Sequence, residues 1–396
     1  MNIIKKWNNV IILSSAQALF QTASILVMTL SGIVGLKLAS DESLATLPIS
    51  VISVGTAIMM IPASFIIKKI GQKKAFMIGT LIGVLAGCLS FYAINTQSFL
   101  LFIFGNMLIG CYQGFAQYYR FAAADSVDDL HKGKAISFVI AGGVVAALAG
   151  PNLAKYTQHL GEVQFAFSFL SITTISILSL LLLFGLKTQK ELKKELDLSN
   201  TTNRPLLQII KQRKTVAALI SSAVGYSVMI MIMTATPIAM HHCGYASEES
   251  ATVIQWHVLG MFVPSFFTGG LIQKFGAKKI VVIGIVILFL HVFFALSGTD
   301  FFHFVSGLIL LGIGWNFMFI GGSTILSKVY FPLEKEKTQA FHDFFVFGII
   351  SISSLSAGTL LNAWGWKGVN IAVIPMLTLA LFTILLFLPK AKNVIE

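Results

Sequence analysis

A short basic stretch occurs twice in this chain, each time between two long apolar segments. The first copy, IIKKIGQKKAFMIG, covers residues 66–79, and the second, LIQKFGAKKIVVIG, covers residues 271–284. When Gly71 is aligned with Gly276, the lysines and the next glycine also align, at a separation of about 205 residues, roughly half the chain. The repeat indicates that one structural unit was duplicated, and the apolar flanks indicate that both copies are embedded in a membrane.

The composition excludes a soluble globular protein. Hydrophobic residues make up 56% of the 396-residue chain, charged residues 11%, and the mean hydropathy is +0.84. A soluble domain is about 25% charged. The chain has room for roughly twelve apolar spans of about 20 residues. Its net charge of +12 does not indicate a nucleic-acid partner, because the basic residues stand in short loops between the spans.

The apolar segments predict an all-α integral membrane protein with twelve transmembrane helices in two pseudo-symmetric six-helix bundles. We expect an N-terminal bundle at 1–186, a cytoplasmic inter-bundle loop at 187–214 and a C-terminal bundle at 215–396. The expected spans are 10–38, 45–67, 75–95, 99–121, 134–157, 164–186, 215–240, 249–272, 279–298, 302–327, 339–362 and 368–388.

The distribution of basic residues predicts the orientation. Of the 28 lysines and arginines, only Lys37, Lys155 and Lys367 fall on the side opposite the N-terminus. Because loops rich in Lys and Arg stay in the cytoplasm, we expect both termini there. The expected location is the inner membrane of a bacterium, in contact with lipid, as a monomer.

The repeated stretch resembles the loop motif of the major facilitator superfamily. The copies read SFIIKKIGQKK at 64–74 and GGLIQKFGAKK at 269–279, with the glycine and the trailing basic residues of the motif. Both copies depart from it at the acidic position, where Lys68 and Gln273 stand. The resemblance implies secondary transport by alternating access, in which two bundles rock around a central site. It also implies that spans one, four, seven and ten line the cavity.

The whole chain is similar to a little-characterised bacterial branch of that superfamily, near which a riboflavin carrier has been placed. The stretches that carry the similarity are SLATLPISV (43–51), GFAQYYRFAAAD (114–125), AGGVVAALAGPNLA (141–154), MTATPIAM (233–240), QWHVLGMFVPSFFTGGLI (255–272) and HDFFVFG (342–348).

Four charged residues are candidates for a gate or latch. Arg120 stands near the cytoplasmic end of span four, Asp125 follows that span, and Asp343 stands near the start of span eleven. Arg120 either pairs locally with an acid such as Asp125, or forms a gate ion pair or an anion-binding group. In the superfamily the start of span eleven lies close to the first basic loop. We therefore hypothesise a charge-swapped latch between Lys68 and Asp343; the alternative is a carboxylate stabilised by the helix dipole.

His257 and Asp343 are the candidates for proton coupling. His257 stands about eight residues into span eight, roughly 12 Å deep at 1.5 Å per residue. It is the titratable residue that we place deep in a second-half span, and histidine titrates near physiological pH. The alternative is a neutral histidine bonded to a neighbouring helix. Because acids are absent from the middle of the first-half spans, the protein either couples through these residues or is a facilitator.

Amide, hydroxyl and aromatic side chains gather on the spans that the resemblance assigns to the cavity. Each can also bond a neighbouring helix, but together they suit a planar or polar organic solute. The candidate substrate-binding residues are Gln17, Gln21, Asn106, Gln113, Gln117, Tyr118, Tyr226, Thr234, Trp256, Trp315 and Asn316.

Other functions have less support. The cysteines lack metal-ligand spacing, and the chain lacks a nucleotide-binding glycine loop or a catalytic set, so we expect no metal, no cofactor and no enzyme activity. We expect proton-coupled secondary transport of a small organic solute, vitamin-like or heteroaromatic. The alternatives are a carrier of a carboxylate siderophore or its iron complex, a multidrug exporter, and a transport-fold sensor or membrane enzyme.

Overall fold

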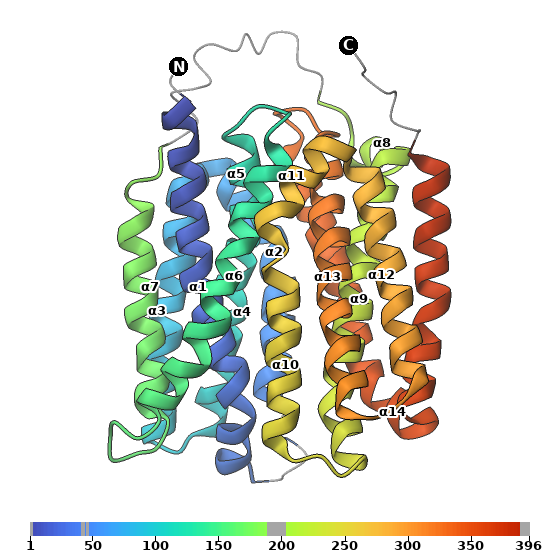
Figure 1. Ribbon diagram of the computed structural model, residues 1–396. Helices are drawn as coiled ribbons and strands as arrows, with labels where there is room; N and C mark the ends of the chain where they lie inside the picture. Colours follow the sequence, from blue (N-terminus) through green and yellow to red (C-terminus); the bar gives the residue numbers. More distant parts are fainter. Residues whose placement is uncertain (1–2, 41–43, 45–46, 188–202, 389–396) are drawn as a thin grey trace. The chain divides into compact units, whose positions relative to one another are not determined.

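The computed structural model describes residues 3–40, 44, 47–187 and 203–388, and every regular element in these ranges is helical (Figure 1). The helices are α1 (Ile3–Leu38), α2 (Leu47–Ile70), α3 (Gln72–Asn95), α4 (Phe99–Ala116), α5 (Tyr119–Asp125), α6 (Lys132–Thr157), α7 (Ala166–Leu183), α8 (Leu206–Ile210), α9 (Arg213–His242), α10 (Ser247–Phe262), α11 (Ser265–Phe275), α12 (Ala277–Ser297), α13 (Phe301–Leu326) and α14 (Lys335–Phe387).

The expected spans correspond to these helices, so the all-α membrane fold is confirmed. Eleven helical segments among the described residues are long and apolar enough to cross a membrane. The span expected at 339–362 forms the first part of α14, which is interrupted at Gly365, where φ is 64°. Only glycine adopts a positive φ without strain, so this residue separates the last two expected spans.

Two other expected spans are each divided between two helices. The span at 249–272 is split into α10 and α11, and Pro264 stands at the junction. Proline lacks a backbone N–H and interrupts the helical ladder. The span at 99–121 is split into α4 and α5 by a turn at Gln117 and Tyr118.

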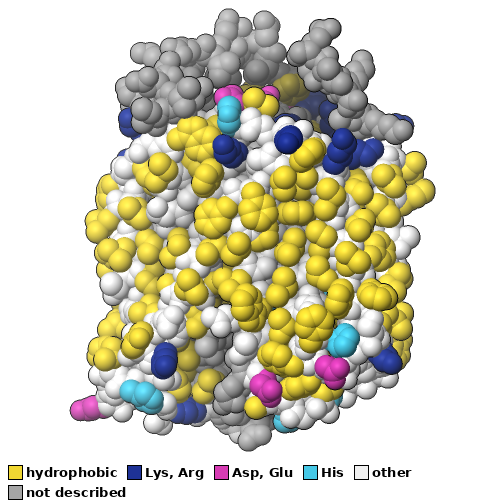
Figure 2. Space-filling model, in the orientation of Figure 1, with side chains coloured by type: hydrophobic (Ala, Val, Ile, Leu, Met, Phe, Trp, Pro, Cys, Tyr) yellow, Lys and Arg dark blue, Asp and Glu magenta, His cyan; other side chains and the backbone are white. Residues whose placement is uncertain are grey.

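The outer surfaces of the helices are largely hydrophobic. On the face shown in Figure 2, hydrophobic side chains cover the middle of the helices, and charged side chains gather near the helix ends. Exposed hydrophobic side chains include Phe65, Phe293 and Ile352. In hydrocarbon an exposed apolar side chain carries no free-energy penalty. Backbone N–H and C=O groups must be hydrogen-bonded within the protein, and a long helix bonds them internally.

The described helices form two compact units. The first unit receives the start of α14, and the second receives the start of α6, so each unit contains a segment from the other half of the sequence. The first unit comprises Met1–Val127, Val139–Thr201 and Gln339–Phe344, and the second comprises Asp128–Phe138, Thr202–Thr338 and Phe345–Glu396.

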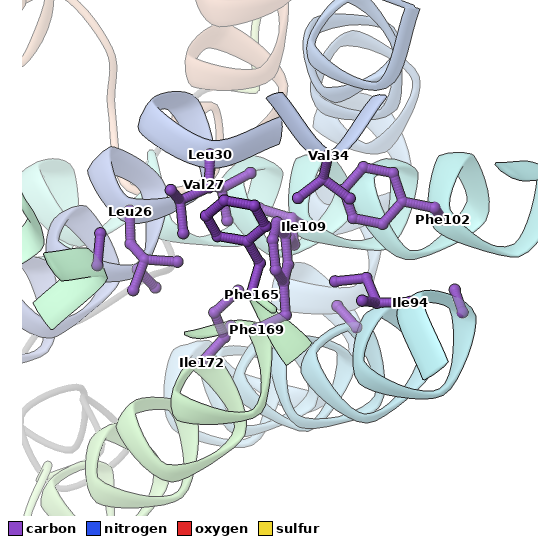
Figure 3. Close-up of a cluster of buried hydrophobic side chains, with 14 of the residues drawn as sticks. Leu26, Val27, Leu30, Val34, Ile94, Phe102, Ile109, Phe165, Phe169 and Ile172 are labelled. Atoms are coloured by element: carbon purple, nitrogen blue, oxygen red, sulfur yellow. The ribbon is translucent and has the colours of Figure 1, made fainter. Parts of the chain in front are cut away.

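The first unit has an apolar core between α1, α3, α4 and α7 (Figure 3). Leu26, Val27 and Leu30 of α1 lie beside Phe169 of α7, which packs edge-on against Phe102 of α4 at 5.1 Å between ring centroids. Because water is already absent from a bilayer, close packing rather than water exclusion stabilises such contacts.

The second unit is arranged around α13, against which α9, α10 and α12 pack. Glycines bring these backbones together. A Cβ added at Gly312 would lie 2.6 Å from the carbonyl oxygen of His257 and 2.6 Å from the backbone nitrogen of Met261. These distances are too short for any side chain, so α10 and α13 approach at a position that requires glycine.

Arg204 attaches the end of the expected inter-bundle loop to the second unit; residues 188–202 of that loop lie outside the described residues. The guanidinium and the backbone N–H of Arg204 donate to the carboxylate of Glu334 over 2.6 to 2.8 Å, and the Glu334 side chain is fully buried. The hydrogen bond from Arg204 is the main cause that lowers the pKa of Glu334 from its usual value of 4.5 to about 2. The pair therefore contributes stability at neutral pH, and that contribution falls as the pH drops from about 4.5 towards 2.

We predict that Gly312→Ala destabilises the protein by about 1–3 kcal/mol, because the added methyl group forces two backbones apart. Gly270→Ala is the matched control, since a Cβ there would meet no atom within 4 Å. Thermal unfolding of both variants in detergent tests the prediction. Equal unfolding temperatures for the two variants would contradict the close approach of α10 and α13.

Candidate functional site

A buried ion pair lies in the first unit, between α5 and the start of α14. Nη2 of Arg120 donates to Oδ1 of Asp343 over 2.5 Å, and the two side chains are 2% and 0% exposed. Nη1 of Arg120 donates to the carbonyl oxygen of Gln117 over 2.9 Å and to its side-chain oxygen over 2.6 Å. The guanidinium lies 4.5 Å from the ring centroid of Phe121. The turn between α4 and α5 thus positions Arg120 towards Asp343.

His342 extends this charged cluster. Its Nδ1 lies 2.7 Å from Oδ1 of Asp343, and its ring packs edge-on against Phe121 at 6.1 Å between centroids. Nε2 of His342 and Oδ2 of Asp343 are buried and have no hydrogen-bond partner within the described residues. We call Arg120, His342 and Asp343 the charged cluster.

The charged cluster has the properties of a functional site. Burying an ion pair costs desolvation free energy that the attraction between the charges does not reliably recover. Ionisable side chains within a membrane are therefore rare, and they mark ion or substrate pathways. Oδ2 of Asp343 can accept a hydrogen bond or a proton, and Nε2 of His342 can donate or accept one. Both atoms can therefore interact with a proton or a solute.

The other gate candidates lie differently. Lys68 is exposed, and Asp125 is half-buried at the end of α5. In this structure the partners of the Asp343 carboxylate are Arg120 and His342, so the hypothesised pair with Lys68 is not made.

Several candidate substrate-binding residues bond neighbouring helices. Asn106 accepts from the Ser31 hydroxyl and donates to the carbonyl of Phe102. Asn316 donates to the carbonyl of Met261 and to Ser265, and accepts from Thr268, which holds the junction of α10 and α11. Three further candidates are bonded. Tyr118 donates to the Met60 carbonyl over 2.9 Å, Gln113 accepts from Thr56 over 3.3 Å, and Gln117 accepts from Arg120 over 2.6 Å.

Other candidates retain polar groups for a ligand. Gln17 is 6% exposed, and its side-chain oxygen has no partner among the described residues. Gln21 and Thr234 are half-buried. Trp256 is different, because it is 50% exposed on α10.

Aromatic candidates meet in the second unit. Tyr226 of α9 is half-buried and packs edge-on against Trp315 of α13 at 5.3 Å between centroids. Trp315 stacks on Phe319, one turn along the same helix, at 5.2 Å and 13°. Nε1 of Trp315 is buried and, among the described residues, has no hydrogen-bond partner.

His257 is fully buried, and its Nδ1 donates to the carbonyl oxygen of Leu308 over 2.8 Å. His291, which sequence reasoning missed, makes a similar bond to Gly307 over 2.7 Å and is also fully buried. His257 is therefore not the only fully buried histidine in the second-half spans. His291 could have been found, because it interrupts the apolar run IVILFLHVFFAL at 285–296.

His342 was also missed as a member of the site, since only the fold places its ring against Phe121. Within the described ranges, no group of three or more His, Cys, Asp or Glu side chains could hold a metal ion.

We predict that Asp343→Leu destabilises the protein by about 3–5 kcal/mol, because it leaves the Arg120 cation buried without its carboxylate. The double variant Arg120→Met with Asp343→Leu is expected to recover most of this loss, since both charges are then gone. Unfolding of the single and double variants in detergent tests the prediction. A double variant as unstable as Asp343→Leu would show that the two side chains do not act as a pair.

Comparison with known proteins agrees with this architecture. The model of the Major Facilitator Superfamily matches residues 12–255 and 219–395. The chain is 41% identical over 384 residues to the riboflavin transporter RfnT of Brucella anthropi, covering 96% of each chain. It is 24% identical to YddS of Bacillus subtilis, an uncharacterized transporter of the same superfamily type, covering 83% of this chain and 78% of YddS.

Solved structures show the same fold. The fucose:proton symporter of Escherichia coli superposes with a TM-score of 0.75 at 17% identity, covering 96% of this chain and 98% of the symporter. The human organic anion transporter TETRAN superposes with a TM-score of 0.78 at 12% identity, covering 96% and 99%. From the family match and the 41% identity, this multi-pass membrane protein belongs to the major facilitator superfamily of transporters.

Proposed function

We propose that this protein transports riboflavin or a closely related flavin across the bacterial inner membrane. The observation that carries the proposal is the 41% identity to a riboflavin transporter over 96% of both chains. The solute fits the amide and aromatic side chains of the expected cavity spans. Gln17 offers an oxygen for the ring or sugar-chain donors, and Tyr226 and Trp315 offer aromatic surfaces.

In the proposed cycle, the halves at 1–186 and 215–396 alternately open the solute site to the two sides of the membrane. The protein acts as a monomer in lipid, with both termini and the loop at 187–214 in the cytoplasm. Lys68 remains a candidate partner for Asp343 in a second conformation. A carboxylate that pairs with one cation in one conformation and with another cation in the other favours two discrete states.

We further propose that Asp343 carries a coupling proton. Its carboxylate faces Arg120 from α5 and His342 from α14, and its Oδ2 is open to a proton. Protonation neutralises the carboxylate and weakens its bond to Arg120. The guanidinium is then released to another acceptor, such as the solute or a residue of the other conformation. His257 is the second candidate, although its Nδ1 is already engaged by Leu308.

Uptake by liposomes that contain the purified protein tests the solute. We expect labelled riboflavin to enter faster than in protein-free liposomes, and unlabelled riboflavin to compete. Ferric and metal-free carboxylate siderophores, and cationic dyes typical of multidrug exporters, should not compete. Gly270→Ala is the control for reconstitution, because it adds a methyl group in open space. Uptake no faster than in empty liposomes would overturn the proposal.

A separate measurement tests the coupling residue. We expect Asp343→Asn to abolish riboflavin accumulation driven by a pH gradient while retaining exchange of labelled for unlabelled riboflavin, because binding persists and proton uptake does not. His257→Gln should keep the gradient-driven accumulation. The opposite pattern, with coupling lost only in His257→Gln, would assign the proton to His257.

A further inference from the structure

Five aromatic rings meet in the second unit, contributed by four helices. Tyr226 of α9 contacts Trp315 and Phe319 of α13 edge-on, each at 5.3 Å between centroids. Tyr226 also contacts Phe347 of α14 at 5.8 Å, and Phe262 of α10 packs edge-on against Trp315 at 6.0 Å. We call these five residues the aromatic cluster.

One polar atom in the aromatic cluster lacks a bond that its burial requires. Trp315 is 2% exposed, yet its Nε1 has no hydrogen-bond partner among the described residues. The other well-buried indole, Trp366, donates from Nε1 to the carbonyl oxygen of Ala295 over 3.1 Å. Buried indole N–H groups normally find such an acceptor, because leaving a donor unpaired costs free energy. The difference leaves the N–H of Trp315 able to donate to a bound molecule.

The position of Tyr226 allows a ligand to reach Trp315. Tyr226 is half-buried, whereas the other four rings are buried. Its ring is nearly perpendicular to those of both Trp315 and Phe319, whose planes are only 13° apart. A rotation of the Tyr226 side chain would expose the stacked pair to a flat ligand of similar width.

We propose that the aromatic cluster is a recognition site for a planar heteroaromatic solute, with the N–H of Trp315 donating to an acceptor on the solute's ring edge. The five rings favour stacking and provide no charge, so the site suits a flat, uncharged ring system rather than a carboxylate or a phosphate. The single donor fixes the orientation of the solute in the plane. This inference rests on the proposed function and assigns recognition of the solute's ring system to the second unit.

Flavin fluorescence tests the assignment, because stacking against an indole quenches the emission of the ring system. Riboflavin is titrated with the purified protein and with Trp315→Phe, which keeps an aromatic ring and removes the N–H. We expect Trp315→Phe to weaken binding by about tenfold, the effect of one buried hydrogen bond, and to reduce the quenching. Unfolding of the ligand-free variant should change only by the packing that the smaller ring gives up, since no protein hydrogen bond is lost.

Two controls separate recognition from packing. Trp366→Phe removes a buried indole whose N–H is bonded to Ala295, so it should lower stability and leave the affinity for riboflavin unchanged. Tyr226→Phe keeps the ring at the edge of the cluster and should retain the affinity, whereas Tyr226→Ala should weaken it. An unchanged affinity in Trp315→Phe, or an equal loss in Trp366→Phe, overturns the inference.

The inference and the proposed function can fail separately. Liposomes that take up riboflavin equally well with wild type and Trp315→Phe would retain the function and reject the site. If the wild type binds lumichrome, which has the same three rings without the sugar chain, and does not bind riboflavin, the proposed solute is wrong. A loss of lumichrome affinity in Trp315→Phe would then still support the site. Binding of neither compound to the wild type rejects both.

Discussion

The hydrocarbon interior of a membrane offers no hydrogen bonds, and this constraint decides how every polar group in the chain is used. Backbone groups are bonded within long helices. Polar side chains must find partners on neighbouring helices, as Asn106 does with Ser31 and Asn316 with Thr268. Once those bonds are assigned, the buried polar atoms that remain unbonded become informative. Gln17, Trp315 and Asp343 carry such atoms among the described residues.

The charged cluster and the aromatic cluster divide the proposed work. The first unit holds a buried ion pair of Arg120 and Asp343, whose strength changes with the protonation of one carboxylate. The aromatic cluster of the second unit holds stacked rings and the unbonded N–H of Trp315, which suit an uncharged planar solute. Because the proposed coupling and recognition residues lie in separate clusters, we expect a variant of the charged cluster to alter coupling alone. We expect a variant of the aromatic cluster to alter recognition alone.

Much of the architecture was predictable from the chain alone. The repeated basic stretch, the apolar segments and the loop charges predicted two halves, the spans and the superfamily. Gly312 and Gly365 are visible in the sequence, but the sequence does not show why glycine is needed at either position. Gly312 is needed because α10 and α13 approach closely there, and Gly365 because the backbone turns with a positive φ. For the candidate site, the sequence indicated Arg120 and Asp343 and omitted His342 and His291.

The sequence by itself determined which segments are buried in the membrane, because hydropathy and helix length are local properties of the chain. It also determined the family, because the motif is continuous in the chain. Only the tertiary structure decided that Asp343 pairs with Arg120 rather than with Lys68. It also decided that the indole N–H of Trp366 finds an acceptor, whereas that of Trp315 finds none among the described residues. Side-chain partners in a helical bundle come from residues far apart in the sequence, such as Arg120 and Asp343, and their contacts depend on helix rotation and packing that no local pattern records.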